Sequence, residues 1–374
     1  MILLKTRKDN VMTKIISLIT AFLMFVFPML NLPHAEVNRE SFKTEYTNVF
    51  VHGFCGWGEQ DSGNKLLPYW GVRNGDLMKY LNARGFDCHS ASVSPTGSAW
   101  DRACELYAQL TGTVTDYGEA HSKRCSHERY GKDYSDCRLI DDWSSENKIN
   151  LFGHSFGGAT VRMLAELLAN GDAAEKEASA DVSPLFTGGK ADLIHCIVTL
   201  SSPHNGTTSY CFAGDIMPSL VNKFSPDSAL YDMQIDNAME LNKKLSTVES
   251  IYYFSYACDG TYIDENGVRR PDSKLIGSTY TQSAEMLCKY TGVTPKGYVI
   301  DEKWLANDGL VNTYSALAPL GAPSVKYDSS NVKPGVWNVM EVIKGDHTTL
   351  QGAQRENFNG RLFWVDLISM INSL

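Results

Sequence analysis

Short apolar runs alternate along the chain with longer stretches in which apolar residues recur every three or four positions. The runs are rich in β-branched and aromatic residues and predict buried strands at 47–51, 149–152, 193–200, 251–256 and 339–343. The periodic stretches predict helices at 77–81, 103–110, 158–168 and 362–371. Strands that alternate with helices indicate an α/β fold in which helices cover both faces of a mostly parallel sheet.

The first 35 residues have a different pattern. Four Lys and Arg residues precede an apolar run over 15–27, and Ala35 is a small residue suited to cleavage. This order of basic and apolar regions predicts a secretory signal peptide at 1–35 and therefore a secreted protein. The run is shorter than the roughly 20 residues that span a bilayer, so we expect no stable membrane insertion of the mature chain. Residues 36–374 contain no repeat or low-complexity linker and predict one domain.

Composition and charge narrow the class of partner. The chain has 374 residues, of which 43% are hydrophobic and 21% charged, as in ordinary globular proteins. Its formal net charge of −9 becomes −12 once the basic segment 1–35 is left out. A negative field repels phosphate backbones, so we expect no nucleic-acid partner and favour an uncharged substrate.

The clearest chemical motif is Gly-His-Ser-Phe-Gly at 153–157. A buried strand leads into it and a predicted helix follows it. This is the strand, tight turn and helix of a nucleophile elbow, in which glycines accommodate a strained serine. The context predicts that Ser155 is a nucleophile, whereas the motif alone is also compatible with an idle serine in a glycine-rich turn.

A serine hydroxyl needs a base to become a nucleophile, and the base needs an acid to orient it. Three histidines follow Ser155 in the chain. His195 lies inside a predicted strand, and His204 leaves little room for an intervening acid. His347 comes late, after a strand, and is therefore the predicted base.

Spacing leaves the orienting acid open. Asp308 lies in an Asn-Asp-Gly turn where a strand-end acid is expected, whereas Asp346 is adjacent to the base and reads as a solvated turn residue. The acids in range are Asp259, Asp301, Asp308 and Asp328.

Acyl transfer also requires two backbone N–H groups to receive the negative oxygen of the tetrahedral intermediate. One donor is expected from Phe156, the residue after the nucleophile. The loop 52–54 follows the first strand, so Phe54 is the second candidate.

A second polar group precedes the elbow. Asp101 lies near the start of a predicted helix, and His121 and His127 follow it. Imidazole and carboxylate groups are zinc ligands, but a His-x5-His spacing does not lie on one face of a helix. By spacing alone these residues are better explained as scattered surface polar groups.

Seven segments in the same order resemble the bacterial family I.5 lipases of the Bacillus and Geobacillus type, with the staphylococcal lipases as relatives. They extend from the first predicted strand towards the C-terminus, and an ordered set of this size is far more specific than one elbow. The matching stretches are VHGFCGWG at 51–58, WDRACE at 100–105, DYGEAH at 116–121, GHSFG at 153–157, SPHNGT at 202–207, NDGLVNT at 307–313 and GVWN at 335–338.

The resemblance implies an α/β-hydrolase fold and a secreted triacylglycerol lipase that acts on acylglycerols or other lipid esters at an interface. It implies a triad of Ser155, Asp308 and His347, with Phe54 and Phe156 forming the oxyanion hole. It also implies a zinc site in an insertion. The ligands would be Asp101, His121, His127 and Asp232, with Cys125 as a soft donor that competes less well. Four protein ligands leave no open position, so this zinc would be structural.

Two departures from the family pattern change what we expect. The family's calcium site uses acids where this chain has Thr349 and Gln354, and calcium prefers carboxylate oxygens, so we expect no calcium there. The segment that carries the lid is short, with only 211–220 and 221–224 as an apolar cover. A small lid keeps a short-chain carboxylesterase as an alternative, and a non-catalytic binding protein on a hydrolase scaffold is the alternative from another class.

Overall fold

The computed structural model describes residues 46–71, 74–210, 225–355 and 358–374. The predicted signal peptide at 1–35 and the predicted lid at 211–224 lie outside these residues. Within the described chain, no helix is long and apolar enough to cross a membrane.

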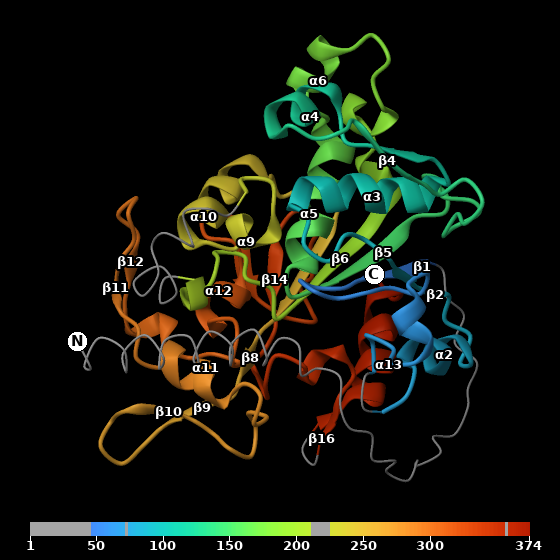
Figure 1. Cartoon of the computed structure of the whole chain (residues 1–374). Coiled ribbons are helices and arrows are strands. Elements are labelled where there is room, and N and C mark those ends of the chain that lie inside the picture. Colours follow the sequence, from blue (N-terminus) through green and yellow to red (C-terminus); the bar gives the residue numbers. More distant parts are fainter. Residues whose placement is uncertain (1–45, 72–73, 211–224, 356–357) are drawn as a thin grey trace.

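A seven-stranded sheet forms the centre of the molecule, and all its neighbouring strands pair in parallel, as the alternating pattern predicts (Figure 1). Parallel neighbours need crossover connections, which the helices supply. In spatial order the strands are β13 (Ser324–Lys326), β14 (Trp337–Val339), β7 (Tyr252–Tyr256), β6 (Ile194–Leu200), β5 (Ile149–His154), β1 (Thr47–Val51) and β2 (Cys88–Ala91).

The helices lie around this sheet, and their positions include all four predicted ones. They are α2 (Leu77–Asn82), α3 (Ala99–Thr111), α4 (Glu119–Cys125), α5 (Gly157–Asn170), α6 (Ala173–Ala178), α9 (Ala229–Asp232), α10 (Ile235–Lys244), α11 (Thr281–Leu287), α12 (Thr313–Leu317) and α13 (Gly360–Ile371). Helix α3 begins where the Ser98 side chain accepts a hydrogen bond from the Asp101 N–H, and it ends at Gly112 with φ 65°. Both features are common helix boundaries.

Within the described ranges, five two-stranded sheets lie outside the central one. They pair β3 (Val114–Asp116) with β4 (Tyr130–Asp133), β8 (Cys258–Asp259) with β15 (Ile343–Lys344), β9 (Thr261–Ile263) with β10 (Arg269–Pro271), β11 (Gly292–Val293) with β12 (Val299–Ile300), and β16 (Gln354–Arg355) with β17 (Phe358–Asn359). The single strand predicted at 339–343 is therefore two strands, β14 and β15, which join different sheets.

The two faces of the central sheet bury alternate residues of each strand. Val49, Leu151 and Ile197 pack with α3 and α5 on one face. Their neighbours Phe50 and Phe152 face the other way, where they pack with α2 and α13. Continuous apolar strands buried on both faces are the pattern expected of a parallel sheet between helical layers.

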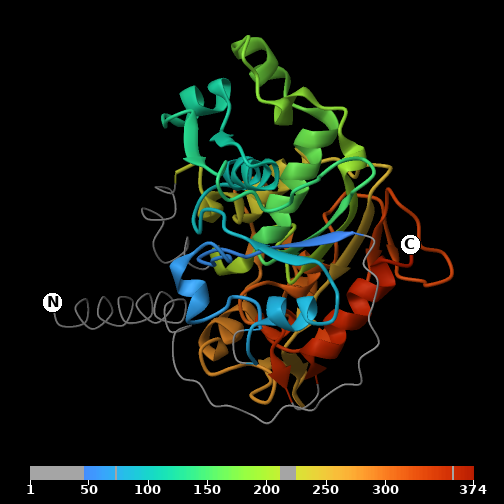
Figure 2. The same cartoon turned by 90° about the vertical axis from the view of Figure 1, so that its right-hand side faces the viewer.

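A small layer that contains α4, β4 and α6 lies beyond α3, away from the α2 and α13 face (Figures 1 and 2). It contains the two histidines predicted to bind metal, in and directly after α4. The resemblance predicts a zinc-binding insertion in this part of the chain, and α3 lies between this layer and the central sheet.

Candidate active site and metal site

Ser155 lies in the turn between β5 and α5, with φ 54°, a left-handed backbone angle that is rare for a residue with a side chain. Its N–H donates to the Leu200 carbonyl at 2.8 Å, and its carbonyl accepts from the Ser202 hydroxyl at 2.6 Å. These bonds hold the strained turn in place. The serine is 9% exposed, so the turn brings its side chain to the edge of the buried core.

The glycines of the motif allow the neighbouring chain to come close. A Cβ at Gly157 would lie 2.8 Å from the His52 carbonyl oxygen. On the other side, a Cβ at Gly53 would lie 2.6 Å from the Ser155 Cβ and 3.1 Å from its Oγ. The loop 52–54 therefore lies directly against the serine turn.

Asp308 and His347 are hydrogen-bonded to each other. The His347 Nδ1 and the Asp308 Oδ2 are 2.8 Å apart, and the His347 N–H donates to the Asp308 carbonyl at 2.9 Å. The second carboxylate oxygen of Asp308 accepts the N–H groups of Leu310 and Val311 at 3.0 and 2.8 Å. Both side chains are buried, so the ring has a fixed orientation.

His347 also lies beside the serine turn. His154, the residue before Ser155, has its Nε2 2.9 Å from the His347 carbonyl oxygen, and the two ring centroids are 4.8 Å apart. The structure thus brings Ser155, His347 and Asp308 to one end of the sheet from three distant parts of the chain.

The other acids in range have other partners. Asp259 binds Lys344 at 2.8 Å and the hydroxyl of Thr261. The carboxylate of Asp346, next to the predicted base, accepts from Gly277 and Thr348. Spacing left Asp259 open beside Asp308, and its expectation of a solvated Asp346 is wrong, since that side chain is buried. Asp308 contacts the ring of His347.

The two remaining histidines are held inside the core. His195 stacks on Tyr46 with centroids 3.9 Å apart, and the Nε2 of His204 is 2.9 Å from the Thr199 hydroxyl. Burial holds the pKa of His204 well below its usual range. These contacts agree with the choice of His347 over the other two.

Arg102 holds the loop 52–54 in place through hydrogen bonds to its backbone. Its guanidinium is fully buried and donates to the carbonyls of His52, Gly53 and Ser94. Burial lowers the pKa of Arg102 to about 10, which still leaves it charged at neutral pH. A buried cation bonded to successive carbonyls fixes the direction of these peptide units.

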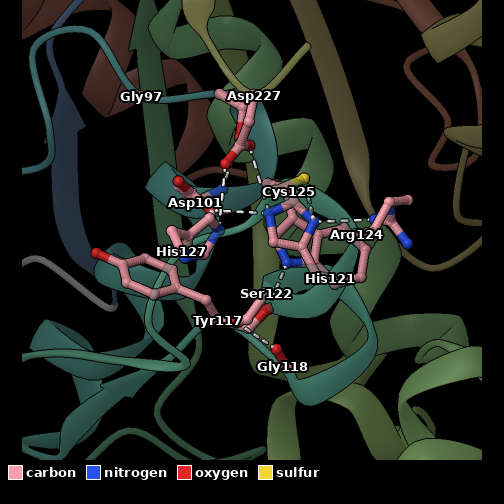
Figure 3. Close-up of polar contacts among 12 residues, drawn as sticks. Gly97, Asp101, Tyr117, Gly118, His121, Ser122, Arg124, Cys125, His127 and Asp227 are labelled. Atoms are coloured by element: carbon pink, nitrogen blue, oxygen red, sulfur yellow. Dashed lines mark hydrogen bonds and ion pairs between the residues drawn. The ribbon is translucent and has the colours of Figure 1, made fainter. Parts of the chain in front are cut away.

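Two histidines, from α4 and the loop after it, meet two acids, one from α3 and one from the segment before α9 (Figure 3). The Nε2 of His121 lies 3.1 Å from Asp101 and 3.3 Å from Asp227. The Nε2 of His127 lies 3.2 Å from Asp227 and 3.9 Å from Asp101. One ring nitrogen of each histidine therefore faces the same two carboxylates.

Two buried atoms of this group have no hydrogen-bond partner, namely the Nε2 of His127 and the Oδ1 of Asp227. Unpaired buried polar atoms are costly, and a cation between them would satisfy both. The Nδ1 of His127 faces the Glu128 carbonyl at 2.7 Å, which favours the tautomer with its lone pair on Nε2. The donor set therefore fits a divalent metal that accepts nitrogen and oxygen ligands.

His121 and the two carboxylates beside it shift each other's pKa values. Burial alone would lower the pKa of His121, but the hydrogen bond to Asp101 and the nearby carboxylate of Asp227 raise it. Burial would likewise raise the pKa of Asp227, but the neighbouring His121 and His127 rings lower it.

Cys125 lies in the same cluster, with the ligand atoms of His121, His127 and Asp227 within 4.8 Å of its own and of one another. Its sulfur is 3.9 Å from the Nδ1 of His121, whereas Asp101 and Asp227 face the Nε2 of that ring. Arg124 also reaches this Nδ1, at 2.9 Å. The thiol thus contacts the ring nitrogen that does not face the carboxylates.

Asp232, the fourth ligand predicted from the resemblance, is not in the group of side chains that could hold a metal, which contains Asp227 instead. Its carboxylate accepts from the Ala99 N–H at 2.8 Å, at the first turn of α3, and burial raises its pKa to about 7. Asp227, five residues earlier, occupies the position beside the histidines. Both acids belong to one short segment, so motif matching could not show which of them turns towards α4.

Comparisons with known proteins agree with this architecture. A family model described as lipase-like, C-terminal domain matches residues 44–224 and 216–363. The chain belongs to this lipase family. The resemblance inferred from the seven motifs is therefore confirmed, and so is the α/β-hydrolase fold.

Individual relatives are similar over most of the chain. Lipase 2 of Staphylococcus aureus is 32% identical over 86% of this chain and 52% of its own length, so the chain spans about half of the curated relatives it matches. Among solved structures, EstA from Clostridium botulinum is 31% identical, with TM-score 0.80, over 93% of this chain and 92% of that one. The Staphylococcus hyicus lipase is 29% identical, with TM-score 0.77, over 91% and 99%.

Proposed function

We propose that this protein is a serine ester hydrolase of the triacylglycerol lipase type, with Ser155 as nucleophile, His347 as base and Asp308 as orienting acid. The hydrogen bond between Asp308 and His347, beside a strained serine turn, is the observation that carries the proposal. Membership of the lipase family supports the same chemistry.

In this mechanism the Ser155 hydroxyl attacks the ester carbonyl while the Nε2 of His347 removes its proton, since the Nδ1 is bonded to Asp308. The carboxylate stabilises the resulting imidazolium. Because two backbone N–H groups hold its other oxygen, Asp308 keeps its orientation during the cycle. His347 then protonates the leaving alcohol, and water repeats the sequence on the acyl-enzyme.

We assign the oxyanion hole to the backbone N–H groups of Phe54 and Phe156. Phe156 directly follows the nucleophile at the start of α5. Phe54 belongs to the loop that lies against Ser155, and Arg102 holds the two preceding carbonyls. A preorganised loop stabilises the developing charge without having to reorganise during the reaction.

We propose that the metal site binds structural zinc through Asp101, His121, His127 and Asp227. Two imidazoles and two carboxylates form a four-ligand set that neutralises the ion. A bound zinc would join α3, α4 and the segment before α9, and this chain's own residues would supply every ligand. Cys125 stays outside the set because it contacts the Nδ1 of His121.

The nucleophile is tested by the variant Ser155→Ala. We expect it to fold as the parent does but to lose hydrolysis of p-nitrophenyl esters by several orders of magnitude, because the attacking oxygen is gone. A fluorophosphonate should label the parent on Ser155 and leave the variant unlabelled. A parent that no fluorophosphonate labels would instead favour a binding protein on a hydrolase scaffold.

The substrate class is tested by an acyl-chain series of p-nitrophenyl esters and by emulsified against dissolved triacylglycerols. We expect turnover of long-chain esters that rises when the substrate forms an interface, as for a lipase. A maximum at the shortest chains, with no rise on emulsification, would identify a short-chain carboxylesterase and refute the acylglycerol assignment.

Zinc is tested by metal analysis of protein purified without chelator, which should contain about one zinc per chain. His127→Ala should lose the metal and the dependence of its melting temperature on chelator, whereas His89→Ala, a surface histidine paired with Asp87, should keep both. After cobalt substitution, the absence of a sulfur-to-cobalt charge-transfer band would agree with nitrogen and oxygen ligands alone. A band that disappears in Cys125→Ser would show that the thiol is a ligand.

We also propose that the protein is exported, because basic residues precede the apolar run over 15–27. Expression of the full chain in a bacterium that secretes proteins should yield a shortened form outside the cells. Mass spectrometry should place its first residue near 36, and full-length protein retained in the cytoplasm would contradict export.

A further inference from the structure

Tyr69 lies between the loop 52–54 and the end of β5, although it belongs to neither. It is 4% exposed, and the centroid of its ring lies 5.8 Å from the ring centroid of His154 and 5.7 Å from that of His52. The mechanism above assigns it no role. Nevertheless, a Cβ at Gly53 would lie 3.1 Å from both the Tyr69 hydroxyl and the Ser155 Oγ.

The Tyr69 hydroxyl joins two parts of the site. It accepts a hydrogen bond from the Gly53 N–H at 2.9 Å, and it is 2.7 Å from the Nδ1 of His154. His154 is 1% exposed, and its other ring nitrogen lies 2.9 Å from the His347 carbonyl oxygen. The chain of contacts therefore runs from the loop 52–54, through two buried side chains, to the main chain of the proposed base.

One arrangement of protons satisfies every member of this chain. A carbonyl oxygen only accepts, so the Nε2 of His154 carries the proton that it donates to His347. The Nδ1 of the neutral ring is then an acceptor, and Tyr69 donates to it while accepting from Gly53. The hydroxyl thus has a partner for its proton and a partner for its lone pair.

The surroundings keep both groups in these states. Burial raises the pKa of Tyr69 above its usual range, so the phenol keeps its proton. Burial also holds the pKa of His154 well below its usual range, so the ring stays neutral. The two groups therefore keep the protonation states on which this arrangement of hydrogen bonds depends.

We propose that Tyr69 is a positioning residue that sets the loop 52–54 and His347 at a fixed distance from each other through His154. This inference rests on the proposed function, since it concerns the alignment of the oxyanion donors with the base. Without the hydroxyl, the Gly53 N–H and the His154 Nδ1 lose their partner. Small displacements of these segments reduce catalysis because the reacting groups must be aligned closely.

The test is Tyr69→Phe, which removes only the hydroxyl. We expect kcat for p-nitrophenyl esters to fall by about 10- to 100-fold with KM changed less than about twofold, because alignment is lost while the substrate surface remains. Tyr253→Phe is the matched control. That hydroxyl is also buried and accepts a backbone N–H, from Val248 at 3.1 Å, but lies outside this chain of contacts. The control should keep the parent kcat, and both variants should be compared by urea unfolding.

A second pair of variants tests the route through His154. His154→Gln keeps an amide donor for the His347 carbonyl, whereas His154→Leu removes it, so the Gln variant should retain several-fold more kcat. Equal kcat in Tyr69→Phe and parent, or equal loss in the two His154 variants, would overturn the inference. These outcomes differ from failure of the proposed function, in which the parent itself would not react with a fluorophosphonate.

Discussion

A serine held at a left-handed backbone angle at the end of a central parallel strand is the constraint on which this site depends. A side chain at φ 54° is unfavourable, and the turn persists because neighbouring groups bind its N–H and carbonyl. The close approach of Gly53 and Gly157 follows from the same requirement. The glycines around Ser155 are therefore needed for close packing of the backbone as well as for the position of the serine.

The parallel sheet explains why distant residues meet at that turn. The loops that follow the carboxyl ends of parallel strands share one edge of the sheet, so the segments after β1, β5 and β6 are neighbours there. His347 follows β15, and its N–H donates to the Asp308 carbonyl. Main-chain and side-chain bonds thus act together to hold Asp308 and His347 at a fixed position relative to each other.

Buried polar groups connect the site to the rest of the molecule. Arg102 holds the loop 52–54 from one side, while Tyr69 and His154 connect it to His347 on the other. Asp101, a proposed metal ligand, directly precedes Arg102 in α3, so one helix contributes to both the proposed metal site and the support of the loop. Paired polar groups of this kind restrict the core to one arrangement, because each unpaired alternative is costly.

Local pattern in the sequence was sufficient for the strands β1, β5, β6 and β7, the helices α2, α3, α5 and α13, the serine turn and the family, because each depends on neighbours within a few residues. The same pattern left Asp308 among several acids, placed Asp232 where Asp227 lies, joined β14 and β15 into one strand, and gave no sign of Tyr69. Those outcomes depend on contacts between residues far apart in the chain, such as the 85 positions between Tyr69 and His154. Only the packed tertiary structure determines such contacts, since a carboxylate or hydroxyl gains its role from the partner that folding brings to it.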